Sequence, residues 1–448
     1  MHGDVPAVGR ERQGDRVADA SGGAGHEGNV AGGHRRTVRE SGRKRPRSLP
    51  RRRRRGVRGA RLGSIAAMRS STLPEPDAEL LAHSAQVQAQ LVAAIDAAGG
   101  WLPFDRLMAL ALYAPGLGYY AAGTTKFGAA SQGGDFVTAP ELSPVFARAL
   151  ARQVAPLLER SAPQLLEFGA GSGVLARDLL TALDALGATV EDYAVVDLSP
   201  DLRERQRVLL QGAPVHWLDA PPAAFEGVVL ANEVLDAMPV TLFARRDGRV
   251  FERGVTHVRG TLHFEDRPAG PELKAAVAAI EDAHGPLPDR YASEIGFAAR
   301  GWTASAARWL TRGALLLIDY GFPQREFYHP QRNGGTLMCH FRHHAHADPL
   351  WLPGANDITA HVDFSAIADA GHAAGLDVLG YTSQARFLLN CDLLGLVPPG
   401  DARTAAAAQT LLSEAEMGEL FKVLLLGKGL GDAPPLPGFA QGDRLHVL

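Results

Sequence analysis

The chain has 448 residues, of which 46% are hydrophobic, and a formal net charge of −3. This length and apolar content can fill a large core, which predicts one big domain with an appended lobe. We expect neither a membrane span nor a signal peptide, because no apolar run approaches the length of a span and no signal-peptide core is present. The only cysteines, Cys339 and Cys391, lack a C-x-x-C pattern, which argues against a disulfide framework or a cysteine zinc site.

The charge is distributed unevenly along the chain. Residues 1–70 hold 18 Lys and Arg against 6 Asp and Glu, whereas the remaining residues hold 28 against 43. This Gly- and Arg-rich arm, with five consecutive arginines at 51–55, lacks the apolar residues needed to fold, so we expect disorder. A nucleic-acid tail and a mitochondrial targeting segment are two interpretations. We favour a third, an inert tail or a start site set too early, since a typical sequence opens at Met68.

The next segment, residues 71–160, is predicted to be helical and to cap the catalytic domain. Apolar positions indicate a helix over 77–98, ended by Gly99 and Gly100. Further helices are expected at 104–112 and 143–158, on either side of a turn-rich stretch with three tyrosines at 113–120.

A glycine-rich turn follows an apolar run that contains Glu167. Gly169, Gly171 and Gly173 are spaced by two, and an amphipathic helix over 174–186 comes next. Such a strand, turn and helix let the backbone approach a nucleotide-like ligand. The spacing differs from the dinucleotide pattern G-x-G-x-x-G, and the acidic residue disfavours a polyphosphate and suits a cation. The motif is typical of class I methyltransferases that bind S-adenosylmethionine, a sulfonium cation.

A second element supports this cofactor. The apolar run at 193–197 is predicted to be the next strand, and it ends in Asp197, 28 residues after Gly169. A carboxylate at that point can accept hydrogen bonds from both ribose hydroxyls. The alternative is a packing turn with an unrelated aspartate at a strand end.

Apolar strands alternate with helices from residue 164 onward, which predicts a parallel, doubly wound α/β sheet. We expect hairpins over 240–264 and helices over 271–310, in an excursion too long for an ordinary connection. Residues 240–310 are therefore predicted to be an inserted substrate-side lobe, and residues 161–239 and 311–448 the cofactor-binding domain. The expected strands are 164–168, 193–197, 214–218, 227–231, 313–319 and 376–381, with a helix at 364–374 and further helices toward residue 427.

Candidate catalytic residues follow the fourth predicted strand. Asn232, Glu233 and Asp236 would lie at the carboxyl end of the sheet, where ligands bind in such folds. Two carboxylates can bind a guanidinium in a fork and raise the nucleophilicity of one nitrogen. On a helical turn Glu233 and Asp236 would share a face, although capping of a following helix explains Asn232 or Asp236 equally well.

The histidine-rich run at 339–346 raises the question of a metal site. Neighbouring histidines on a strand point to opposite faces, and no partner motif such as H-E-x-x-H is present. We therefore predict no metal and expect a polar, substrate-facing or interface segment. Asp319 and Tyr320 end the fifth strand near the same crevice, where strand termination also accounts for them.

The sequence resembles the MidA-like methyltransferases, whose mitochondrial member is the arginine methyltransferase complex I assembly factor 7. The resemblance covers about residues 100–439. It is carried, in order, by A-P-G-L-G-Y-Y at 114–120, G-D-F-V-T-A-P-E at 134–141, L-E-F-G-A-G-S-G at 166–173, A-N-E-V-L-D-A-M-P-V at 231–240 and D-I-T-A-H-V-D-F at 357–364. Two departures are Asp197, where the family often has Glu, and Val234-Leu235 in place of an aromatic pair.

The resemblance implies a seven-stranded, Rossmann-like class I methyltransferase fold with S-adenosyl-L-methionine as donor. It also implies symmetric dimethylation of an arginine on a protein substrate, which for the mitochondrial member is a subunit of respiratory complex I. Methylation of a small molecule and a non-catalytic, cofactor-binding assembly factor remain alternatives. Nucleic acid is disfavoured because the segment after the fourth strand is acidic. The expected location is the bacterial cytoplasm, or the mitochondrial matrix of a eukaryote, and a homodimer is left open.

Overall fold

The computed structural model of the protein describes residues 73–122, 138–431 and 436–448. The predicted disordered arm, the proposed start at Met68 and the first four residues of the G-D-F-V-T-A-P-E segment lie outside the described residues.

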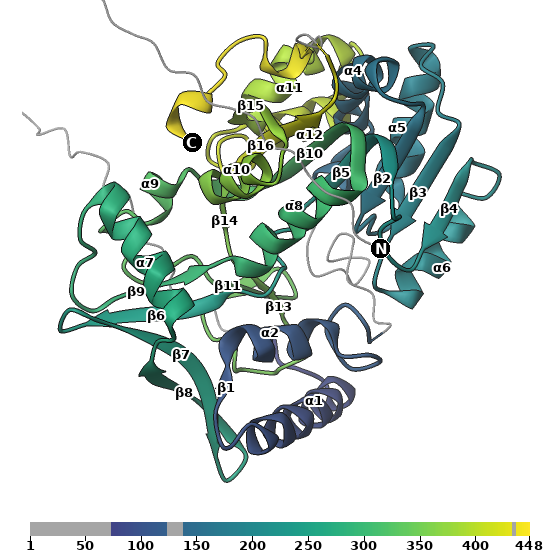
Figure 1. The fold of residues 1–448 in the computed structure, drawn as a ribbon. Helices are drawn as coiled ribbons and strands as arrows, with labels where there is room; N and C mark the ends of the chain where they lie inside the picture. Colours follow the sequence, from purple (N-terminus) through teal and green to yellow (C-terminus); the bar gives the residue numbers. More distant parts are fainter. Residues whose placement is uncertain (1–72, 123–137, 432–435) are drawn as a thin grey trace, which may run out of the picture. The chain divides into compact units, whose positions relative to one another are not determined.

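The larger sheet has eight strands in the order β15-β16-β10-β5-β2-β3-β4, with β14 beside β10 (Figure 1). The strands β4, β3, β2, β5 and β10 are parallel, and β16 is antiparallel to both of its neighbours. The predicted doubly wound sheet, with seven strands along its main path, is therefore confirmed. Its strands are β2 (Gln164–Phe168), β3 (Asp192–Val196), β4 (Val215–Leu218), β5 (Phe225–Asn232), β10 (Leu310–Phe322), β14 (Val362–Asp363), β15 (Asp377–Ser383) and β16 (Phe421–Lys428).

Alternate strand residues supply two cores, one on each face of this sheet. Leu165 and Val228 belong to one core, and their neighbours Leu166 and Val229 to the other. The first core is covered by α4 (Val145–Arg160), α5 (Val174–Ala185), α11 (Gln384–Asn390) and α12 (Ala402–Leu412). The second is covered by α8 (Phe297–Trp309) and α10 (Phe364–Ala373), while α6 (Pro200–Leu209) connects β3 to β4.

The expectation of helices up to residue 427 is wrong at its end, where β16 is a strand. Its sequence, F-K-V-L-L-L-G-K, is buried almost throughout, so it shows neither the alternation of a half-exposed strand nor a helical stripe. The prediction of helices throughout 271–310 is also wrong between α7 (Pro271–His284) and α8, where β9 (Tyr291–Ile295) pairs with β6.

A second sheet of five strands is formed mainly by residues 240–310. It has the order β1-β7-β6-β9, with β8 on β7, and comprises β1 (Leu102–Pro103), β6 (Thr241–Arg246), β7 (Arg249–Val258), β8 (Thr261–Pro268) and β9. Both α1 (Ala78–Ala97) and α2 (Phe104–Tyr113) share a core with Leu242 and Val255, whereas α7 shares one with Phe243. Elements from the start of the described chain thus complete this sheet, beside which Figure 1 shows α1 and α2.

A small third sheet links the two larger ones. It consists of β11 (Met338–Phe341) between β12 (His344–His346) and β13 (Asp357–Thr359). Cys339 and Ile358 share the core of α1 and α2, while β14, which follows β13, pairs with β10 of the large sheet. The remaining short helices of the described residues are α3 (Ala139–Leu142), α9 (Gln324–Phe327) and the 3-10 helices η3 (Leu393–Leu396), η4 (Pro437–Phe439) and η5 (Leu445–Val447).

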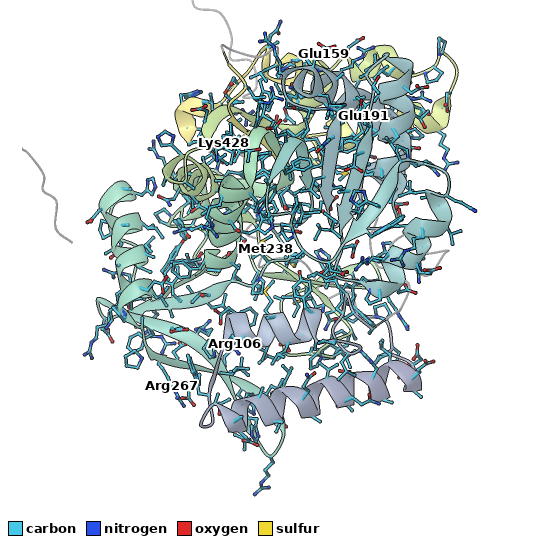
Figure 2. All side chains as sticks on the ribbon, turned by 45° about the vertical axis from the view of Figure 1, so that its right-hand side comes forward. Arg106, Glu159, Glu191, Met238, Arg267 and Lys428 are labelled. Atoms are coloured by element: carbon cyan, nitrogen blue, oxygen red, sulfur yellow. The ribbon has the colours of Figure 1, made fainter. Side chains whose placement is uncertain are left out.

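The labelled side chains show which end of the large sheet faces the second sheet. Met238, six residues after the end of β5, lies between the large sheet and the helix α2 that carries Arg106 (Figure 2). Glu191, just before β3, lies at the opposite end of the strands. Within the three described stretches, no helix is both long and apolar enough to cross a membrane.

Candidate functional site

A cavity of about 640 Å³ opens at the carboxyl ends of the parallel strands. It is bounded by the turn after β2, the residues after β3 and β5, the end of α2 and the strand β13. This is where ligands bind in open α/β sheets. Of the site residues predicted from sequence, all line the cavity except Gly173, which precedes the first residue of α5.

The glycine turn requires glycine at its first position. Gly169 has a φ of 62°, and a Cβ there would lie 3.1 Å from Cγ2 of Val234. Gly171 and Gly173 also adopt left-handed conformations, with φ of 55° and 85°. The N–H of Gly169 donates to the carbonyl of Val196 at 2.9 Å, which ties the turn to the end of β3. The main chain therefore forms one wall of the cavity.

Glu167 lies beneath this turn, almost completely buried. Its carboxylate accepts a hydrogen bond of 2.8 Å from the hydroxyl of Tyr193. Burial, with a smaller contribution from the nearby Asp197 carboxylate, raises the pKa of Glu167 to about 7 despite the opposing effect of the Tyr193 hydrogen bond. A cationic ligand at this end would favour the ionised form.

Asp197 and the glycine turn share one anchor, Gln206 of α6. The Nε2 group of Gln206 donates to the carbonyl of Gly171 at 2.8 Å and to Oδ2 of Asp197 at 2.9 Å. Its Oε1 accepts from Nε1 of Trp217 at 2.8 Å, and the other oxygen of Asp197 accepts the N–H of Ser199 at 2.9 Å. Burial raises the pKa of Asp197. Our sequence analysis missed Gln206, although a glutamine between Leu202 and Leu210 interrupts an apolar stripe at helical spacing.

The segment after β5 is an irregular turn, so the prediction that Glu233 and Asp236 share a helical face is wrong. Glu233 has a φ of 54°, and the N–H groups of Val234, Leu235 and Asp236 all converge on Oδ2 of Asp319. The three distances are 3.2, 2.9 and 3.3 Å. The backbone of this turn is thus held in place by a carboxylate of β10, the strand that pairs with β5 in the sheet.

Asp319 was expected near the crevice at the end of a strand, but β10 continues past it to Phe322. It is fully buried, and its second oxygen accepts the N–H of Tyr320 at 2.9 Å. Burial raises the pKa of Asp319 to about 7, although the surrounding backbone N–H groups lower it in part. No local sequence signal shows that the two strand ends lie side by side; the parallel pairing of β5 with β10 provides the contact.

The cavity is acidic along its whole length. Glu141, Glu167, Asp197 and Asp219 line the end near the glycine turn, and Glu233, Asp236 and Asp357 line the other end. Among the described residues that line it, none is Lys or Arg. Burial, followed by repulsion from Asp319, raises the pKa of Glu233 to about 8 and raises that of Asp236 as well. Such a cavity is suited to positively charged ligands.

Aromatic side chains enclose the second end. Tyr113 and Tyr120, which the sequence placed in a tyrosine-rich turn, stack with ring centroids 5.6 Å apart and an interplanar angle of 18°. The hydroxyl of Tyr113 donates to the carbonyl of Ala237 at 2.8 Å, and that of Tyr120 donates to Oδ1 of Asp357 at 2.8 Å. Tyr320 and His340 also line the cavity.

Asn232 provides a test of whether a methyl donor fits. Its Nδ2 donates to Oε1 of Glu233 at 3.2 Å, but its Oδ1 is buried and has no hydrogen-bond partner within the described structure. A buried carbonyl oxygen without a donor is suited to a ligand ammonium. With the close backbone of the glycine turn and the carboxylate of Asp197, this atom fits S-adenosylmethionine. No three His, Cys, Asp or Glu side chains within residues 73–122, 138–431 and 436–448 form a candidate metal site.

The fold and the cavity define an S-adenosylmethionine-dependent methyltransferase, and comparison with known proteins gives its family. The model of the family Methyltransf_28, described as S-adenosyl-L-methionine-dependent methyltransferases, matches residues 147–382, more than half of the chain. The chain belongs to this family, as the resemblance to the MidA-like proteins predicted.

Relatives of known sequence or structure agree with this assignment. The chain is 26% identical to the mitochondrial protein arginine methyltransferase NDUFAF7 homolog of Drosophila melanogaster, over 76% of this chain and 86% of the relative. It is 28% identical to NDUFAF7 of Danio rerio, over 72% of this chain and 83% of the relative. A crystal structure of a Burkholderia thailandensis methyl transferase bound to S-adenosyl-homocysteine has 52% identity and a TM-score of 0.80. It matches 84% of this chain and 100% of its own. S-adenosyl-L-methionine is therefore the cofactor.

Proposed function

We propose that the protein methylates the guanidinium group of an arginine in a protein substrate. The observation that carries this proposal is the acidic end of the cavity, which Glu233, Asp236 and Asp357 line. A planar guanidinium with five N–H donors matches several carboxylates better than a neutral hydroxyl or thiol acceptor does. The names of the relatives, which are protein arginine methyltransferases, support the same acceptor.

The residues that hold the cofactor would be those of the glycine-turn end. Gly169 and Gly171 bring the main chain close, Asp197 accepts the ribose hydroxyls, and Oδ1 of Asn232 accepts from the ammonium group, with Glu167 supplying negative charge nearby. The cofactor, when bound, supplies an electrophilic methyl group on a positively charged sulfur.

The residues at the acceptor end would orient one guanidinium nitrogen toward that methyl group and then accept the proton that this nitrogen loses. Glu233 and Asp236 hold the guanidinium charge on one side, which leaves electron density on the nitrogen to be methylated. As the new nitrogen–carbon bond forms, the bond from the methyl group to sulfur would break and leave neutral S-adenosyl-homocysteine, and the methylated nitrogen must lose a proton. The Glu233 carboxyl would be the general base, because a guanidinium bound beside it lowers its pKa from about 8 and keeps it ionised. Tyr113, Tyr120 and Tyr320 line this end of the cavity, where their rings would limit the access of water.

We further propose the finer points that the resemblance implies. These are symmetric dimethylation, with a subunit of respiratory complex I or its counterpart as substrate, in the bacterial cytoplasm or the mitochondrial matrix. We propose that residues 161–239 and 311–448 bind the cofactor and that the lobe at 240–310 contacts the substrate. The helix α2, which shares a core with the second sheet, ends at the cavity with Tyr113, and this arrangement supports contact with a macromolecule.

The direct test is methyl labelling. The protein is incubated with isotopically labelled S-adenosylmethionine and a lysate from a strain that lacks it, and mass spectrometry locates the label. We expect label on arginine of one protein, lost in Glu233→Gln and kept in the matched control Glu191→Gln, whose side chain lies at the far end of the sheet (Figure 2). Label found only on small metabolites would overturn the proposal. If Glu233→Gln loses labelling but still supports assembly of respiratory complex I, then a non-catalytic role as an assembly factor would account for the biological function.

A further inference from the structure

The turn after β5 is held at successive backbone groups by three other parts of the chain. Three of its N–H groups bond to Asp319 of β10. The carbonyl of Asp236 accepts the N–H of Ala360, the residue after β13, at 2.9 Å. The carbonyl of Ala237 accepts the hydroxyl of Tyr113, the last residue of α2, at 2.8 Å. The conformation of this turn therefore depends on α2 and β13 as well as on the large sheet.

The contact made by Tyr113 joins distant parts of the chain. Its side chain packs against the core that α1 and α2 share with the second sheet, whereas Ala237 lies 124 residues further along the chain and is 6% exposed. A buried carbonyl that loses a hydrogen-bond donor costs about 1–3 kcal/mol. The hydroxyl of Tyr113 therefore contributes to keeping the turn in its observed conformation.

The segment that follows α2 fixes the ring of Tyr113. A Cβ at Gly118 would lie 2.5 Å from the backbone nitrogen of Ala114, so only glycine allows the chain to fold back this tightly. The N–H of Tyr120 donates to the carbonyl of Leu112 at 2.8 Å, and the Tyr120 ring stacks on that of Tyr113 with centroids 5.6 Å apart. Tyr113 is thus aligned by its own neighbours in sequence.

Tyr113 acts in this position as a hydrogen-bond donor and not as a proton acceptor. Burial raises the pKa of its hydroxyl, which therefore stays protonated and bonded to the carbonyl of Ala237. The group that it affects is the carboxylate of Asp236, because the peptide groups on both sides of Asp236 belong to the turn that it holds. A displacement of about 1 Å at a reacting group can slow a reaction on the order of a hundredfold.

We propose that Tyr113 is a positioning residue for methyl transfer, which holds the turn after β5 through the carbonyl of Ala237 and thereby orients the carboxylate of Asp236 toward the acceptor. This inference rests on the proposed function, which places Asp236 at the acceptor. It gives the helix α2 a part in the enzyme: α2 completes the acceptor end without supplying a group that reacts.

The test compares Tyr113→Phe with the matched control Tyr328→Phe. Each substitution removes one tyrosine hydroxyl from a backbone carbonyl, because Tyr328 donates to the carbonyl of Glu294 at 3.0 Å. Tyr328, however, belongs to the core shared with α7 and is not among the described residues that line the cavity. Both variants should therefore lose a similar amount of stability, and only Tyr113→Phe should change the reaction.

The first measurement is the initial rate of total label transfer from saturating, isotopically labelled S-adenosylmethionine to a lysate from a strain that lacks the protein. We expect the maximal rate of Tyr113→Phe to be about tenfold lower than that of the wild type. The lysate concentration that gives half the maximal rate, and the Kd for S-adenosyl-homocysteine, should stay within about twofold. Tyr328→Phe should leave all three values unchanged.

The second measurement, hydrogen exchange followed by mass spectrometry, needs no acceptor. Exchange of the N–H groups at 234–236 should be about tenfold faster in Tyr113→Phe, because the turn opens more easily, and that at 169–173 should not change. In Tyr328→Phe both segments should exchange as in the wild type. Wild-type exchange at 234–236 in Tyr113→Phe would overturn the proposal.

The two hypotheses fail in different ways. A wild-type maximal rate in Tyr113→Phe would overturn the positioning role, whichever molecule receives the label. An equal loss of rate in Tyr328→Phe would overturn it as well, because the loss would then reflect stability alone. Label found only on small metabolites in the wild type would instead contradict the proposed arginine function, and the rate of Tyr113→Phe would still test the contact.

Discussion

The anchor at Gln206 offers the sharpest test of how the cofactor end is built. Gln206→Met retains most of the side-chain volume in the core but removes both hydrogen bonds from Nε2, to Gly171 and to Asp197. The glycine turn and the carboxylate proposed to bind the ribose then lose the link that this side chain provides, while the backbone of Gly171 still donates to Asp197. The substitution therefore probes preorganisation without touching the cofactor itself.

The expected magnitude follows from the two bonds. A hydrogen bond to a charged acceptor contributes about 1.5–3 kcal/mol, and a neutral one about 1 kcal/mol. Asp197 keeps the N–H of Ser199, and the free protein bears part of the loss, so only a fraction appears in binding. We expect the Kd for S-adenosyl-homocysteine to rise about tenfold, equivalent to about 1.4 kcal/mol.

Isothermal titration calorimetry with S-adenosyl-homocysteine measures this change directly. Gln88→Met is a matched control, because Gln88 also donates to a backbone carbonyl, that of Gly260, but lies on α1 in the other part of the fold. Its Kd should equal that of the wild type. A Kd for Gln206→Met within twofold of wild type, in a protein of unchanged helix content, would show that the turn needs no such anchor.

Three further predictions concern the turn, the positioning carboxylate and pH. Gly169→Ala places a Cβ 3.1 Å from Val234 at a φ of 62°, so equilibrium dialysis should show S-adenosyl-homocysteine binding weakened more than tenfold. Asp319→Asn puts an NH₂ group against backbone N–H donors, so kcat should fall about thirtyfold or more. If the Kd for the cofactor rises to the same extent, the role of Asp319 is not confined to the acceptor side. Burial raises the pKa of Glu233 to about 8, so between about pH 4.5 and 8 the folded protein holds a proton that the unfolded chain has released. The free energy of unfolding should therefore fall as the pH rises through this range, by on the order of 1 kcal/mol per pH unit. In thermal melts, the Tm of Glu233→Gln should decrease less with rising pH than that of the wild type. If both proteins show the same change of Tm with pH, Glu233 does not hold the proton in question.

The cofactor end could be predicted from sequence because its signals are local. A buried strand, three glycines and a helix are contiguous, and the strand that ends at Asp197 follows at the expected distance. The parallel, doubly wound character of the sheet followed from the alternation of apolar segments with helices. By contrast, β16 was missed because a strand buried on both faces has no periodicity to distinguish it from a helix.

The acceptor end could be predicted only in part. Glu233 and Asp236 were identified from one strand end, but Asp319 and Asp357 act on the same space from positions 80 or more residues further along the chain. Tyr120 precedes its partner Asp357 by 237 residues. Contacts of this kind depend on which strands and helices become neighbours, and no pattern within one segment encodes that.

The hydroxyl of Tyr113 on the carbonyl of Ala237 has a consequence for how such enzymes diversify. In the proposed arrangement, the part of the pocket that would bind the donor is encoded within one continuous stretch of sequence, whereas the part that would bind the recipient is assembled from distant ones. Substitutions in α2 or β13 would then change recipient preference without altering the donor-binding part. A lineage could in this way acquire new targets without passing through an inactive ancestor.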